Sequence, residues 1–122
     1  MGKRGPSEHN KTRTAAAKLV PKEEKLEIFD FWKLTFNKSR VSMDAKREAA
    51  IGWAIYTYGI EACRQAILGC ASSPFHMGQN KAGKKYDGID LIFRDAEHVE
   101  MFLERYEVNT KTSARDEWIT NG

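Results

Sequence analysis

The residues with the most evident chemical potential lie between Gly78 and Tyr86, in the run Gly-Gln-Asn-Lys-Ala-Gly-Lys-Lys-Tyr. Its first seven residues match the spacing G-x-x-x-x-G-K of a phosphate-binding loop, whose backbone N–H groups hold nucleotide phosphates. The next residue is Lys85, where a Ser or Thr should hold Mg²⁺, and no strand is predicted before the segment. We therefore reject a nucleotide-hydrolysing site at this position.

The same run is a polar, basic loop whose side chains suit a different chemistry. It offers an amide, three cations and one aromatic ring: Asn80, Lys81, Lys84, Lys85 and Tyr86. Lysines contact phosphate as point charges that read no sequence, and an aromatic ring can stack on a base. The composition indicates contact with a nucleic-acid backbone, but an exposed, solubilising loop would look the same, so both interpretations stay open.

A second group of cations lies at the start of a predicted helix. These residues are Arg40, Lys46 and Arg47. We expect Ser42 to be the N-cap, and a helix N-terminus with nearby cations is a plausible phosphate anchor. The alternative is an ordinary solvated face, whose charge Asp44 and Glu48 partly neutralise.

No arrangement of residues predicts catalysis or a bound metal. The three histidines are scattered and lack metal-ligand spacing: His9, His76 and His98. Asp87 and Asp90 are expected to cap a short helix at Ile89 rather than to form a carboxylate centre. We therefore predict no enzymatic activity and no cofactor. A small metal-dependent nuclease is the least favoured class.

The two cysteines predict a structural role. Cys63 and Cys70 are seven residues apart in one predicted helix, a distance of about 10 Å, which is too far for a disulfide. We expect both side chains to be buried, reduced and chemically inert.

The elements on either side of the loop must fix its two ends. The apolar helix predicted from Ile60 to Cys70 stops before Ser72–Pro74, and a second apolar run begins at Ile89. We expect both runs, together with Phe75 and Met77, to enter one core. That arrangement would pin the lysines to the surface.

Helical periodicity accounts for most of the remaining chain. The segments that show it are 22–36, 42–58, 60–70 and 96–106, with a short helix or turn at 89–94. Gly59 is expected to form a left-handed cap, and Asp95 to cap the last helix. The sequence predicts an all-α fold, a compact bundle of four or five short helices with a long basic loop and disordered tails.

Charge divides the chain unevenly. The net charge of the 122 residues is +3, yet residues 1–20 alone carry five basic residues against one acidic residue, a net charge of +4. We interpret 1–20 as a basic disordered arm, 21–106 as the helical domain and 107–122 as a polar C-terminal tail. The arm could add phosphate contacts or could only aid solubility. No apolar run of about 18 residues predicts a membrane span, and no signal peptide is expected.

The region from Ile28 to Leu103 resembles the C-terminal module of phage replication proteins, including replisome organisers and DnaD-like helicase loaders. The matching pieces are Phe31-Trp32, Arg40-x-Ser42 with Arg47, Tyr58-Gly59-Ile60-Glu61, Ala66-Ile67-x-Gly69 and Ser73-Pro74-Phe75-His76-Met77-Gly78-Gln79-Asn80 continuing to Lys84-Lys85-Tyr86-Asp87. The resemblance implies a small helical module for phage or prophage DNA replication in the cytoplasm of a bacterial host. It further implies binding to DNA, often single-stranded, and contact with a replicative helicase or its loader.

Larger members of that group carry an N-terminal winged-helix domain that recognises origin DNA, whereas a segment of about 20 residues with a net positive charge precedes the module here. An accessory role is therefore expected rather than origin recognition. The alternative function is a protein–protein interaction module that docks on a replication or host protein without binding nucleic acid. Its surface would be the exposed part of the Trp53 and Tyr56 face, or the tail around Trp118.

Overall fold

The computed structural model describes the backbone of residues 8–121 and the side chains of residues 12–110. Within this part of the chain the fold is all-α, with helices but no strand. The helices are α1 (Glu8–Lys18), α2 (Lys22–Phe36), α3 (Ala45–Tyr58), α4 (Ile60–Ala71), α5 (Ile89–Ile92) and α6 (Ala96–Asn121). This confirms the predicted fold class, with more helices than the four or five that the sequence indicated.

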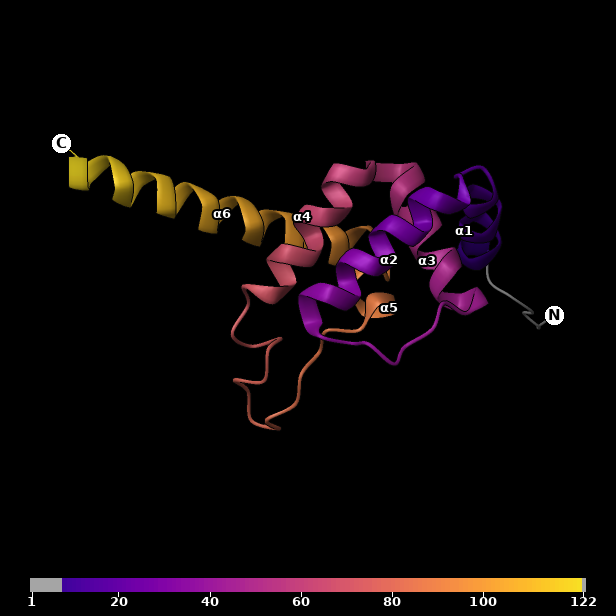
Figure 1. The fold of residues 1–122 in the computed structure, drawn as a ribbon, viewed down its shortest axis with the longest axis horizontal. Helices are drawn as coiled ribbons and strands as arrows, with labels where there is room; N and C mark the ends of the chain where they lie inside the picture. Colours follow the sequence, from indigo (N-terminus) through magenta and orange to yellow (C-terminus); the bar gives the residue numbers. More distant parts are fainter. Residues whose placement is uncertain (1–7, 122) are drawn as a thin grey trace.

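The core lies where α2, α3, α4, α5 and the first turns of α6 meet. Side chains from each of these helices are almost fully buried, namely Ile28, Trp32, Ile51, Cys63, Ile67, Ile89, Ile92, Val99 and Phe102. Helix α4 packs on α6 and on α2, while α1 packs on α3. The C-terminal half of α6 extends away from the other helices (Figure 1). The long connection between α4 and α5 and the shorter one between α2 and α3 leave the bundle on the same side (Figure 1).

The predicted disordered arm is wrong for residues 8–20, because α1 occupies most of this segment. Ala16, Ala17 and Val20 are buried, although the segment has no long apolar side chain at helical spacing. The small side chains allow α1 to approach α3 so closely that a Cβ at Gly52 would overlap Ala17. Residues 1–7 of the predicted arm lie outside the described residues.

The predicted disorder of the polar tail at 107–122 also needs correction, because α6 does not end near Tyr106 but continues without a break to Asn121. Residues 107–121 contain neither Pro nor Gly, so nothing in the sequence stops the helix begun by the buried turns at Val99 and Phe102. The side chain of Trp118 lies outside the described side chains.

The predicted helix ends are partly confirmed. Asp95 accepts a hydrogen bond from the His98 N–H at 2.9 Å, as expected of a cap. Gly59 has a positive φ of 92° but a ψ of 163°, so it joins α3 to α4 as a single residue without forming the left-handed cap that was predicted. The N-cap of α3 is Asp44 rather than Ser42, because the Asp44 carboxylate accepts from the Arg47 N–H at 2.8 Å.

Candidate nucleic-acid interface

The basic loop spans residues 72–88, and its C-terminal end is held at Asp87. The backbone carbonyl of Asp87 accepts a hydrogen bond from Trp32 Nε1 at 2.8 Å, and both residues are buried. The Asp87 carboxylate forms an ion pair with Lys38 Nζ at 2.9 Å, with its side chain only 7% exposed. Asp87 therefore anchors the loop and does not cap α5 as the sequence suggested. Ile89 and Ile92 then enter the core, as expected.

The N-terminal end of the loop is anchored by small polar contacts. Ser73 is buried and its hydroxyl shares a hydrogen bond with His76 Nδ1 at 2.8 Å. The His76 ring lies edge-on to Phe102, with centroids 4.9 Å apart. Met77 packs against the core and pairs across the loop with Lys85 through an isolated antiparallel bridge.

The side chain of Asn80 holds the tip of the loop through hydrogen bonds to its backbone. Its side-chain NH₂ group donates to the carbonyl oxygens of Phe75 at 2.7 Å and Lys84 at 2.8 Å. Its side-chain oxygen accepts from the Lys84 N–H at 3.2 Å. Both amide hydrogens are used in these two bonds, so Asn80 has no side-chain N–H left for a ligand. Asn80 therefore positions the loop, and its side-chain donors are not open to the ligand contact expected from the sequence.

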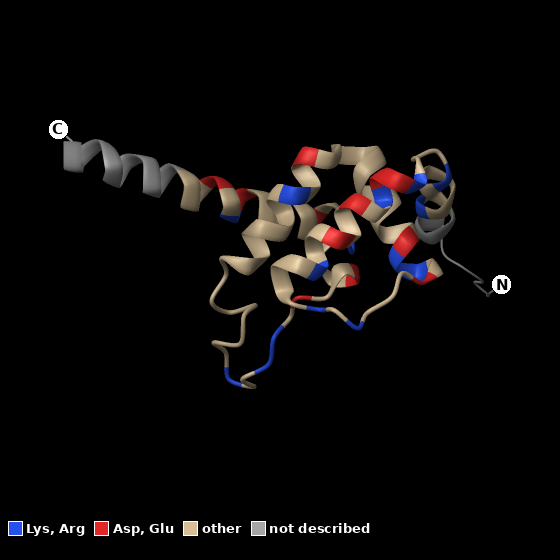
Figure 2. Ribbon diagram, viewed as in Figure 1, with Lys and Arg blue, Asp and Glu red and all other residues tan. Residues whose placement is uncertain are grey.

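The three loop lysines project into solvent. Lys81, Lys84 and Lys85 are exposed, and no carboxylate among side chains 12–110 forms an ion pair with any of them. Figure 2 shows the basic positions along the loop that leaves the bundle. Because Lys38 neutralises the one carboxylate of the loop segment, its exposed surface carries only positive charge.

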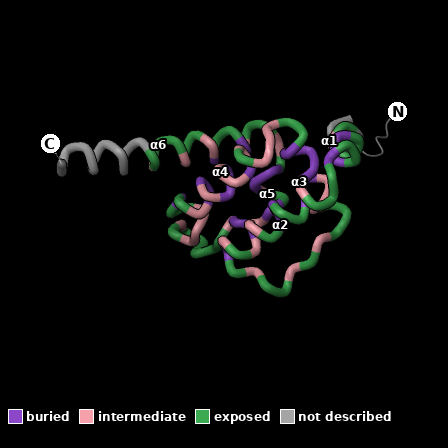
Figure 3. The backbone as a smooth tube through the Cα atoms, turned by 45° about the horizontal axis from the view of Figure 1, so that its top comes forward, coloured by how far each residue is buried: buried purple, intermediate pink, exposed green. Residues whose placement is uncertain are grey.

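Tyr86 and Phe75 form an aromatic pair beside these lysines. Their rings are nearly parallel, at 15°, with centroids 5.8 Å apart. Tyr86 is half-buried and Lys84 Nζ lies 5.9 Å from its ring centroid. Phe75 was expected in the core, but it is 54% exposed, because the turn held by Asn80 directs it to the surface. Figure 3 shows that the loop after α4 is mostly exposed or intermediate.

The second predicted group of cations differs from the loop lysines, because two of its three members have acidic partners. Arg40 is exposed in the connection between α2 and α3. Arg47 is occupied locally, because its guanidinium donates to the Asp44 carboxylate at 3.0 Å and to the Ser42 carbonyl at 3.2 Å. Lys46 extends toward Asp90, with the charged atoms 3.9 Å apart, so the phosphate anchor expected at this helix start is partly engaged by acidic neighbours.

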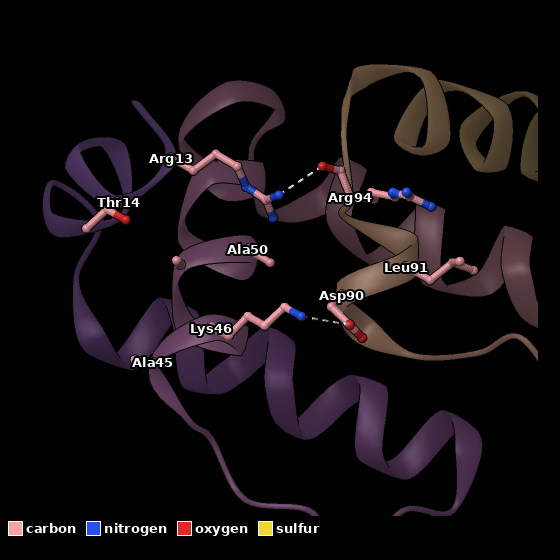
Figure 4. A pocket seen from close by; sticks show the side chains of 9 residues that line it. Arg13, Thr14, Ala45, Lys46, Ala50, Asp90, Leu91 and Arg94 are labelled. Carbon is pink, nitrogen blue, oxygen red and sulfur yellow. Dashed lines mark hydrogen bonds and ion pairs between the residues drawn. The ribbon is translucent and has the colours of Figure 1, made fainter. Parts of the chain in front are cut away.

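Lys46 and Asp90 border a pocket of about 630 Å³ between α1, α3 and α5 (Figure 4). Arg13 lies on the opposite wall and donates to the backbone carbonyls of Arg94 at 2.9 Å and Phe93 at 2.8 Å. Burial lowers the pKa of Arg13 from its usual value. Arg13 therefore joins α1 to the end of α5, a role that sequence periodicity could not reveal.

The aromatic face proposed for protein docking is covered at Trp53 and exposed at Tyr56. Trp53 is 8% exposed, and the Arg13 guanidinium lies 5.1 Å from its ring centroid. Tyr56 on the same helix is 59% exposed. The exposed part of this face is therefore Tyr56, because Arg13 of α1 covers Trp53.

The two cysteines are part of the packed core. Cys63 and Cys70 are free thiols, fully buried as predicted, and burial raises the pKa of each to about 12. Within the described residues, no three of His, Cys, Asp and Glu gather where they could hold a metal ion. The described helices include none that combines the length and apolar character needed to cross a membrane.

Comparison with known proteins adds no relative: no family model, curated protein or solved structure matches the chain.

Proposed function

We propose that the protein binds the phosphate backbone of DNA through the loop at residues 72–88, as an accessory module of phage or prophage DNA replication. The observation that carries this proposal is the exposure of Lys81, Lys84 and Lys85 without carboxylate partners among the described side chains. The loop is anchored at Ser73 and at Asp87, so little further ordering is needed when a ligand binds.

The number of exposed cations determines the expected affinity for DNA and its dependence on salt. Three lysines neutralise up to three phosphates, and Arg40 on the neighbouring connection could add a fourth contact. Each neutralised phosphate releases counterion, so the slope of log K against log salt should be about −2 to −4. Such binding is weak and independent of sequence. It suits a module that acts beside other replication proteins.

The replication role rests on the resemblance of Ile28 to Leu103, of which the run from Ser73 to Asp87 is the most specific piece. It supports a replicative helicase or its loader as the protein partner, and the cytoplasm of a bacterial host as the location. The same loop residues carry both the resemblance and the exposed charge, which is why we place the DNA contact there.

The direct test is fluorescence anisotropy with labelled DNA 20-mers at several salt concentrations. Simultaneous Lys→Ala changes at Lys81, Lys84 and Lys85 should weaken binding at least tenfold and flatten the salt dependence. A control removes the same charge from the helices through Lys→Ala changes at Lys18, Lys22 and Lys33. Equal weakening in both variants, or none in either, would contradict binding through the loop.

A further inference from the structure

Phe75 has an unusual environment for a large aromatic residue. More than half of its surface faces solvent, although it lies four residues after the end of α4. One ring face is supported by Tyr86 in a nearly parallel stack, and the His76 ring meets it edge-on with centroids 5.2 Å apart. The exposed ring is therefore held by neighbours on the protein side and open on the other.

The backbone around this ring is fixed by several hydrogen bonds. Asn80 binds the carbonyl of Phe75, and the Tyr86 N–H donates to the His76 carbonyl at 2.7 Å. The same Asn80 amide donates to the carbonyl of Lys84, so the backbone of Phe75 and the backbone of Lys84 are held by one side chain. A ligand that contacts both would meet a surface already ordered, which lowers the entropic cost of binding.

A fixed ring next to exposed cations matches the chemistry of unpaired nucleotides. Bases offer a flat π-face that stacks on an aromatic ring, and their phosphates pair with lysines. In a duplex both faces of each internal base are covered by neighbouring bases, so an exposed protein ring has no face to stack on. The combination of Phe75 with Lys84 and Lys85 therefore distinguishes single strands from duplex, which the lysines alone do not do.

We propose that Phe75, supported by Tyr86, is a base-stacking residue that makes the loop select single-stranded nucleic acid. This inference rests on the proposed function, since the lysines supply the electrostatic part of the binding. Phe75 would contribute to the binding affinity by contact with a base, and the lysines by contact with the phosphates.

Anisotropy titrations with four ligands distinguish the base contact from the phosphate contact. The ligands are (dT)20, an abasic 20-mer with the same phosphates, a 20-base-pair duplex, and (U)20. Phe75→Leu keeps an apolar side chain against Tyr86 but removes the ring, and Phe75→Trp restores an aromatic face. Leu34→Ala, at an 83% exposed position on α2, is the control for loss of a surface apolar group. Circular dichroism and urea unfolding establish that each variant is folded.

Phe75→Leu should weaken binding to (dT)20 and (U)20 by about 5- to 100-fold, since one stacked base contributes that much. Its affinity for the abasic strand and the duplex should stay at the wild-type value, with an unchanged salt slope. Phe75→Trp should recover binding to (dT)20, and Leu34→Ala should behave as wild type.

Wild-type affinity of Phe75→Leu for (dT)20 would overturn the stacking role. If the triple lysine variant still lost binding, the proposed phosphate contact would survive that result. Equal binding of wild-type protein to (dT)20 and to the abasic strand would overturn the stacking role in the same way. No binding of any ligand by the wild-type protein would overturn both proposals together.

Discussion

Lys25 Nζ lies 2.7 Å from a carboxylate oxygen of Glu48, and the Lys25 side chain is only 8% exposed. The same ammonium group donates to the backbone carbonyl of Ala17 at 3.1 Å. One cation thus joins three helices: it belongs to α2, its acidic partner to α3, and the carbonyl to the last turn of α1. Lys25 is a second donor to the Ala17 carbonyl at the end of α1, which also accepts from the Val20 N–H at 3.2 Å.

Replacement of Lys25 by Met should destabilise the protein by about 1–3 kcal/mol, because the Ala17 carbonyl and the Glu48 carboxylate both lose a partner. Urea unfolding followed by circular dichroism measures this change. The hydrogen bond from Lys25 lowers the pKa of Glu48 below its ordinary value of 4.5. The associated stability is therefore present above pH 4.5 and is lost as the pH falls further, and Lys25→Met should flatten that loss.

Lys81→Met is the matched control, since Lys81 is exposed in the loop. It should leave the urea midpoint unchanged. Equal midpoints for Lys25→Met and Lys81→Met would show that the buried pair does not hold α1 in place.

Gly69→Ala should strongly destabilise the contact between α4 and α6. A Cβ at Gly69 would overlap the backbone carbonyl oxygen of Phe102, and neither helix can yield by rotating a side chain. Overpacking of this kind costs about 1–3 kcal/mol, measurable as a lower urea midpoint. Gly83→Ala is the comparison, because it meets no atom within 4 Å and suffers only from its positive φ of 61°. A Gly69→Ala protein as stable as the wild type would mean that the helices do not cross this closely in solution.

The thiols of Cys63 and Cys70 should not react with Ellman's reagent in the native protein at about pH 8, where an exposed thiol of ordinary pKa would react. Both are fully buried, and each thiol pKa is raised to about 12. Both thiols should titrate once urea unfolds the protein. Cys70 Sγ also lies 3.6 Å from the carbonyl oxygen of Tyr86, so its protection depends on the docked base of the loop. Rapid native labelling at Cys70 would show that the loop base opens readily.

His76 should make stability depend on pH in the weakly acidic range. Burial lowers the pKa of His76 below its ordinary value of 6.5, and the positive Arg105 and the nearby His98 on α6 lower it further. The unfolded chain therefore binds the proton first, so stability falls as the pH drops below 6.5 toward the lowered pKa. Urea midpoints on either side of that value, at about pH 7.5 and about pH 5.5, measure this loss.

In His76→Gln, which keeps a polar side chain near the Ser73 hydroxyl, this loss should be smaller than in the wild type. An identical decline in the two proteins would assign the pH dependence to other groups.

The main helices were predictable because their apolar residues recur at helical spacing. Ile28 and Trp32 on α2, and Cys63 and Ile67 on α4, are buried as that pattern indicates. The cap at Asp95 follows from local chemistry in the same way. The exposure of the loop lysines was also expected from composition.

Features that depend on distant partners were not predictable. Helix α1 buries Ala16 and Ala17, of which Ala17 fits against Gly52, and alanine produces no apolar stripe in the sequence. The apolar side chain of Phe75 predicts a core position, and the hydrogen bond from Asn80 that holds its backbone in the surface turn has no sequence signature. Lys38 and Asp87 are separated by 49 positions, so no local pattern identifies them as a pair.

That pairing has a consequence for the rate at which a polyanion could reach the protein. Because Lys38 neutralises the Asp87 carboxylate, the electric potential around the loop comes mainly from the three lysine ammonium groups. Such a field acts before contact and guides diffusing strands toward the surface, an effect that added salt suppresses. Lys38 would then speed encounter while never touching the strand that arrives.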